Sequence, residues 1–133
     1  MPDFQILLSS IARRPAMYVG RCSLSAVSHY LYGYCHALSD LGSNETPLDG
    51  WIHWVELRFG ISHSAWHWTR ILLHNYGSEQ AAIEALPELH REFLAERAQI
   101  GVKGIESTLE QRLIEEHGEP WYEPPTTSTA IND

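Results

Sequence analysis

Apolar side chains recur at the spacing of an amphipathic helix along most of the chain. Asp3 is a suitable N-cap for a first helix, whose apolar face would hold Phe4, Leu7, Leu8 and Ile11. Ser23 is a suitable N-cap for a second helix ending near Gly42, with the apolar stripe Leu24, Val27, Leu31, Cys35 and Leu38. The first part of the chain is therefore predicted to form a helical pair.

The connection between these two helices is too apolar for a plain solvent loop. Its sequence is Arg14-Pro15-Ala16-Met17-Tyr18-Val19-Gly20. Pro15 disfavours a helical backbone in the residue before it, so the first helix is predicted to end there. We expect Met17 to Val19 to run extended, with Met17 and Tyr18 in the core and Gly20 making the turn.

The pattern of residues 51–61, which follow a loop at 43–50, fits two kinds of structure. Val55, Leu57, Phe59 and Ile61 alternate with polar or small residues, as in a strand. Trp51, Trp54, Val55 and Arg58 instead fit one side of a helix. We favour the helix, because no partner strand is evident and a lone strand leaves its backbone groups unpaired.

Three further helices are predicted in the second half. One is capped by Ser62 or Ser64 and ends at Tyr76, and the longest runs from Ser78 to about Gln99. Pro87 should kink or divide that longest helix. Gly101 and Gly104 interrupt the pattern, and a last helix with the apolar residues Ile105, Leu109 and Leu113 ends at Gly118.

These elements predict an all-α fold, a compact single-domain bundle of five to six helices over residues 1–118. A Pro- and Thr-rich tail follows over residues 119–133. The alternative is an α+β fold with a short strand near 54–61. A chain of 133 residues, 44% of them hydrophobic, is long enough to bury one core. We expect no membrane span, no signal peptide, and a cytoplasmic protein in which Cys22 and Cys35 are reduced.

The net charge of −8 argues against nucleic acid as a direct ligand, because phosphate contacts need clustered Lys and Arg. The charge is also uneven. Residues 1–78 hold five acidic and five basic residues, whereas residues 79–133 hold twelve acidic residues and four basic ones. An acidic half of this kind suits a basic partner.

Glutamates in this acidic half recur at helical spacing. Glu84, Glu88, Glu92 and Glu96 form a slowly rotating stripe, partly neutralised by Arg91 and Arg97, and Glu106, Glu110, Glu115 and Glu116 form a second acidic surface. An ordinary solvated face is the simpler interpretation. If the surface docks a partner, the candidate partner-binding residues are Glu84, Glu88, Glu92, Glu96, Glu106 and Glu110, with Trp66 and Arg70 as hot-spot types.

Candidates for catalysis and metal binding are weaker. Arg14-Pro15-x-Met17-Tyr18-x-Gly20 resembles a short motif of gyrase-type ATPases, but the next helix lacks that family's carboxylate and Asn. His63, His67 and His74 could share a helix face and bind zinc in a small metal-dependent enzyme. No H-E-x-x-H motif, acid or Cys accompanies them, so we predict no catalytic residue, no metal and no cofactor.

The order of several short motifs resembles a set of small, uncharacterised bacterial helical proteins. The motifs are Arg14 to Gly20, Ser23-Leu24 and Gly33-Tyr34, followed by Trp66 and the helix from Ser78 to Phe93. The resemblance covers residues 4–94. Such proteins look like immunity proteins encoded beside secreted antibacterial toxins. The resemblance implies an immunity protein, not an enzyme, that neutralises a cognate toxin by direct contact.

A third possibility is a regulatory or oligomerisation module that self-associates through its tryptophans. Four of the five, Trp51, Trp54, Trp66 and Trp68, lie close together in the sequence. Most should lie in the core, although their spacing leaves some ring facing outward. The oligomeric state does not follow from the sequence.

Overall fold

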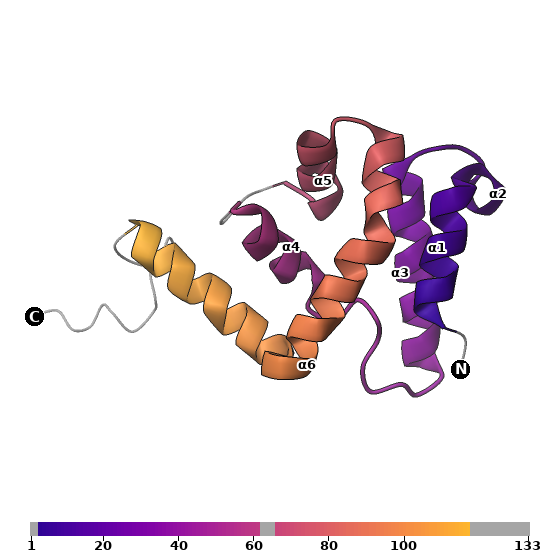
Figure 1. Cartoon of the computed structure of the whole chain (residues 1–133). Coiled ribbons are helices and arrows are strands. Elements are labelled where there is room, and N and C mark those ends of the chain that lie inside the picture. The colour runs from indigo at the N-terminus through magenta and orange to yellow at the C-terminus, as the bar shows by residue number, and fades with distance from the viewer. Residues whose placement is uncertain (1–2, 62–65, 118–133) are drawn as a thin grey trace, which may run out of the picture.

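A computed structural model describes residues 3–61 and 66–117, and both ranges are helical. Six helices follow in order: α1 (Phe4–Arg13), α2 (Pro15–Val19), α3 (Leu24–Asp40), α4 (Trp51–Phe59), α5 (Trp68–Tyr76) and α6 (Glu79–His117) (Figure 1). The predicted all-α fold is confirmed. Residues 51–59, for which a strand was the alternative, form α4, and neither described range contains a strand. The predicted tail at 119–133 lies outside the described residues.

The first part of α6, residues 79–100, is the element on which the other helices pack. It contacts α1 and α3 as well as α4 and α5, and Figure 1 shows these two pairs on opposite sides of it. Its predicted apolar face is buried: Ala82, Leu86, Leu89 and Phe93. One core therefore joins all the long helices.

Three tryptophans form the centre of this core. Trp51 stacks on Trp54 with ring centroids 5.5 Å apart, and it meets the edges of Trp68 and Phe93 at the same distance. Each such pair adds about 0.5–1.5 kcal/mol beyond the burial of its area. The prediction that most of the tryptophans lie in the core is confirmed, and these three are not available for self-association.

Two of the predicted N-caps are present. The Asp3 carboxylate accepts from Gln5 N, and the Ser23 hydroxyl accepts from Ala26 N. Ser78, where the longest helix was predicted to begin, also caps it, because its hydroxyl accepts from Ala81 N. Glu79 adds a cap that the sequence does not reveal, because its Oε1 accepts from Leu24 N at 2.6 Å. This bond joins the start of α6 to the start of α3.

The prediction of an extended segment at Met17 to Val19 is wrong. Pro15–Val19 forms α2, with Pro15 in the first turn, where its missing N–H costs nothing. Gly20 ends α2 in the left-handed region, at a φ of 85°. Pro15 and Val19 lie one turn apart and take the inner side, so Met17 is 72% exposed and Tyr18 38% exposed. The expected burial of Met17 and Tyr18 is therefore also wrong.

The division of α6 lies at Gly101 and not at Pro87. Gly101 has a φ of 77° and a ψ of 169°, a backbone conformation essentially restricted to glycine, and it is the non-helical residue within α6. The helix then resumes, so Gly104 does not interrupt it as expected. Residues 102–117 form what we call the α6 arm, which runs from the bend towards the side of α4 (Figure 1).

The arm is held by an apolar stripe and by a polar contact of Arg112. Ile105, Leu109 and Leu113 are buried, as their spacing predicts. Arg112 Nη1 donates to Leu57 O at 3.0 Å, near the end of α4.

α5 begins at Trp68 with His67 as its N-cap. The predicted caps Ser62 and Ser64 lie outside the described residues. No helix in the described part of the chain is long and apolar enough to span a membrane.

Candidate functional site

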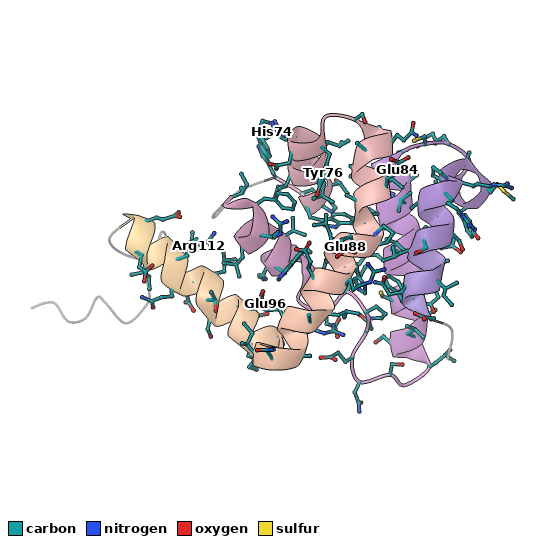
Figure 2. The ribbon with its side chains drawn as sticks, viewed as in Figure 1. His74, Tyr76, Glu84, Glu88, Glu96 and Arg112 are labelled. Carbon is teal, nitrogen blue, oxygen red and sulfur yellow. The ribbon has the colours of Figure 1, made fainter. Side chains whose placement is uncertain are left out.

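The candidate acidic residues lie at the surface of α6. Glu84, Glu88 and Glu96 are exposed on its first part, where Figure 2 labels them. Glu106 and Glu110 are exposed on the arm. The structure therefore places the predicted acidic residues along one continuous but bent helix.

Some of these glutamates are engaged within the molecule. Glu92 Oε1 accepts from Arg58 Nε at 2.9 Å and links α6 to α4, while Glu88 pairs with Arg91 one turn away on α6. Glu84 accepts from the Gln80 amide at 3.0 Å. Exposed pairs of this kind are worth about 0–1 kcal/mol, so the Glu88 and Glu84 contacts open easily towards a partner. Glu92, fixed between two helices, is the candidate least suited to binding.

Trp66 and Arg70, the other predicted interface residues, form a separate cluster: Trp66 lies just before α5, and Arg70 lies on it. The Arg70 guanidinium lies over the Trp66 ring, 4.2 Å from its centroid. The His74 ring packs edge-on against Trp66, with ring centroids 5.4 Å apart. The cation–π contact holds an exposed Arg and a partly buried Trp in one arrangement. The predicted interface residues thus fall on two elements, α5 and α6.

The histidines proposed as zinc ligands have other contacts. His67 Nδ1 accepts from Thr69 N and caps α5, and His74 packs on Trp66 as described. His63 lies outside the described residues. Within residues 3–61 and 66–117, no group of three or more His, Cys, Asp or Glu side chains is placed to hold a metal ion.

His90 is the more buried of the two fully buried polar side chains in the described part of the chain, and it was not among the residues predicted from the sequence. Its side chain is 1% exposed and lies in the apolar face of α6 beside Leu86 and Phe93. Nε2 is 2.8 Å from Pro47 O, which can only accept, so Nε2 carries the hydrogen. Nδ1 then accepts from the Gln5 amide at 2.9 Å. Burial lowers the pKa of His90, which favours this neutral form.

Arg97 fastens the loop at 43–50 to α6. Its Nη1 donates to Thr46 O at 2.8 Å and to Asp49 O at 3.0 Å, and its Nη2 is 3.5 Å from Glu45 Oε1. Arg97, expected to neutralise part of the glutamate stripe, is thus also a tie to this loop, and its ion-pair partner Glu45 lies outside the stripe. His90 and Arg97 are polar residues at positions where the helical spacing of the longest helix predicts apolar ones, about one turn on either side of Phe93. This mismatch is the signal in the sequence that could have found them.

Two open pockets flank this fastened loop. One, of about 460 Å³, lies between the start of α1, the loop and α6, and is lined by Phe4, Leu38, Pro47, His90, Leu94 and Arg97 among others. The other, of about 420 Å³, includes Tyr32 and Cys35. Burial raises the pKa of the Cys35 thiol and raises that of Tyr32 to about 12, so both stay protonated at neutral pH. Neither is an activated nucleophile.

His90 and Arg97 therefore have structural roles. Of the residues predicted to bind a partner, those on the acidic surface of α6 and in the Trp66–Arg70 cluster remain accessible. Comparison of the chain with protein-family models, with curated proteins and with solved structures finds no match.

Proposed function

We propose that this protein is an immunity protein that binds a basic toxin domain through the acidic surface of α6 and neutralises it by direct contact. The observation that carries the proposal is the charge of this helix. α6 holds nine glutamates and four basic residues, and of the glutamates Glu79 and Glu92 form bonds to other described helices that fix their positions. Glu84, Glu88, Glu96, Glu106 and Glu110 remain directed to solvent.

The basic residues of α6 offset less than half of this charge, because four cations stand against nine glutamates. Three of them are engaged: Arg97 donates to loop carbonyls, Arg112 donates to Leu57 O, and Arg91 pairs with Glu88. Lys103 is exposed on the arm. The outward field of the helix is therefore negative, which speeds encounter with a basic partner and repels an acidic one.

The acidic surface is also rigid before binding. Residues 79–100 are packed on both sides by four helices, so their glutamates project from a fixed backbone. A surface that is already ordered loses little backbone entropy on association. The Trp66–Arg70 stack supplies residue types common at interface hot spots.

The test is neutralisation of the protein encoded by the adjoining gene. We expect that product to be toxic when expressed alone and harmless when this protein is co-expressed, with a complex that co-purifies. A variant with Glu84, Glu88, Glu96, Glu106 and Glu110 changed to Gln should bind about 10–100-fold more weakly at low salt, since exposed ion pairs are worth about 0.2–1 kcal/mol each.

A smaller variant, Glu84→Gln with Glu88→Gln, is compared with a matched control that removes the same number of charges away from α6, Asp40→Asn with Glu45→Gln, and the control should bind like the wild type. If the adjoining gene's product is harmless, or if its toxicity is the same with and without this protein, the proposed function is wrong. If the complex forms but both variants bind alike, the acidic surface of α6 is not the interface.

A further inference from the structure

The corner where α1, α2 and α3 meet differs in charge from the rest of the molecule. Arg13, Arg14 and Arg21 are all exposed there, and none forms an ion pair within the described residues. The acidic residues of α1 and α3 lie elsewhere, with Asp3 capping the far end of α1 and Asp40 ending α3. Three cations therefore lie at this corner, where the nearby carboxylate of Glu79 is engaged by Leu24 N, in a chain whose net charge is −8.

The same corner carries exposed apolar and aromatic side chains. Met17 is 72% exposed, and Tyr18 and Tyr30 are each 38% exposed. The two tyrosine rings meet edge-on with centroids 6.1 Å apart, and Arg14 Nη1 lies 3.8 Å from the Met17 sulfur. We call the surface formed by Arg13, Arg14, Met17, Tyr18, Arg21 and Tyr30 the α2 corner.

The backbone holds these side chains in place. Val19 packs against the core on the inner side of α2, and Gly20 closes the turn with its N–H bonded to Ala16 O at 2.9 Å. The following helix is capped twice, by Ser23 and by Glu79. Because the chain is already ordered, α2 presents Met17 and Tyr18 outward at little entropic cost to a binding partner.

We propose that the α2 corner docks an acidic segment of another protein, separate from the basic partner proposed for α6. Tyr, Met and Arg are enriched in the cores of protein interfaces, and Arg and Tyr dominate their hot spots. Arg side chains pair with carboxylates through two parallel hydrogen bonds, which suits an acidic peptide. The proposal does not depend on the function proposed above.

Other anionic partners fit less well. Stable DNA binding uses about 6–10 phosphate contacts, more than three arginines can make. An anionic membrane would repel the rest of a chain with a net charge of −8. α2 has 5 residues, and peripheral membrane helices are considerably longer. The charge and the aromatic content together favour a protein segment.

The test begins with a random peptide library displayed on phage and selected against the full chain. We expect the enriched peptides to be rich in Asp and Glu and to include an aromatic or aliphatic residue. A synthetic peptide of that sequence should bind Arg13→Gln/Arg14→Gln/Arg21→Gln at least about tenfold more weakly at about 50 mM salt. The difference should shrink at about 500 mM salt, where charges are screened.

The apolar part of the surface is tested by Met17→Ala/Tyr18→Ala, which should weaken the peptide at both salt concentrations. The control is Ala98→Glu/Gln99→Glu/Ser107→Glu, which changes the net charge by the same amount on exposed positions of α6. It should weaken the peptide less than the triple arginine variant does at about 50 mM salt, and it should bind within about threefold of the wild type at about 500 mM salt. Unchanged circular dichroism and melting temperature show that each variant is folded.

Four outcomes would overturn the proposal. In the first, the enriched peptides are not acidic. In the second, they bind the triple arginine variant as tightly as the wild type. In the third, no acidic peptide is selected and the arginines are needed for binding to phosphatidylglycerol vesicles or a DNA duplex. The fourth is self-association in sedimentation that the triple variant abolishes, which assigns the corner to a second copy of the chain.

Discussion

The two parts of α6 on either side of Gly101 use one helix in different ways. Residues 79–100 pack between two pairs of helices, and their polar side chains His90 and Arg97 turn inward to hold a loop. The arm buries a single stripe and directs most of its polar side chains to solvent. A helix with several neighbours uses its polar residues for structure, whereas one with a single buried side leaves them for a partner.

The strongest test of this contrast compares one deep residue from each part. Phe93 is 0% exposed among the tryptophans, and Leu113 is 7% exposed on the arm. Phe93→Ala should lower the free energy of unfolding by about 4 kcal/mol, because it opens a cavity in the shared core. Leu113→Ala should cost about 2 kcal/mol. Urea unfolding followed by tryptophan fluorescence measures both, and equal losses would show that the arm is as much part of the core as Phe93.

The bend itself is tested at Gly101. Gly101→Ala puts a Cβ at a φ of 77° and a ψ of 169°, so we expect a loss of about 1–3 kcal/mol or a straightened helix. Hydrogen exchange should then speed up in residues 102–117 before it does in residues 79–100. Gly33→Ala is the control, because Gly33 is an exposed residue inside α3 with no atom within 4 Å of a built Cβ. It should stabilise the protein by about 1 kcal/mol.

The buried His90 should make the free energy of unfolding depend on pH. The pKa of folded His90 lies below the ordinary 6.5, so between those two values the unfolded chain binds a proton that the folded chain does not. This contribution to stability is complete above about pH 6.5 and is lost as the pH falls, by at most about 1.4 kcal/mol per pH unit.

Urea unfolding at pH 7.5 and at pH 5.5 measures the effect. His90→Gln, which keeps a polar side chain but cannot titrate, should lose that part of the slope. His29→Gln, at an exposed position, should keep it. Identical slopes for His90→Gln and the wild type would show that His90 is not the group responsible.

The contrast between the two parts also explains what the sequence revealed. The main helices and three of their caps follow from spacing that is local in the chain, as at Ser23 and Ser78. α2 was not predicted, because a helix of about one turn is too short to show a repeating apolar spacing. Pro15 also fits the first turn of a helix as well as the end of one. The partners of His90 and Arg97 include backbone carbonyls 43 to 51 residues away, which any residue type provides. Hydrogen bonds of this kind leave no pattern in the sequence other than the polar residue that donates them.

The candidate interface divides along the same line. The exposure of Glu84, Glu96, Glu106 and Glu110 follows from the helical period, because the opposite side is apolar. Which glutamates form ion pairs within the molecule does not follow from this spacing, since Glu92 pairs with Arg58 on another helix, 34 residues away in the sequence. Glu79 likewise caps α3 over 55 residues. Charge pattern predicted the surface, whereas tertiary contacts decide which charges remain for binding.

The smallest expected effect concerns the polar tie of the arm. Arg112→Ala removes the hydrogen bond to Leu57 O and should cost about 1 kcal/mol, because a net hydrogen bond contributes about that much. Arg112→Lys keeps the charge and a donor and should recover part of it, while Lys103→Ala, at an exposed position, should cost almost nothing. If the arm unfolds locally while residues 79–100 stay folded, Arg112→Ala will speed hydrogen exchange in residues 102–117 and leave residues 79–100 protected. Equal acceleration in both parts would mean that α6 opens as one unit, and the division at Gly101 would then be one of shape and not of stability.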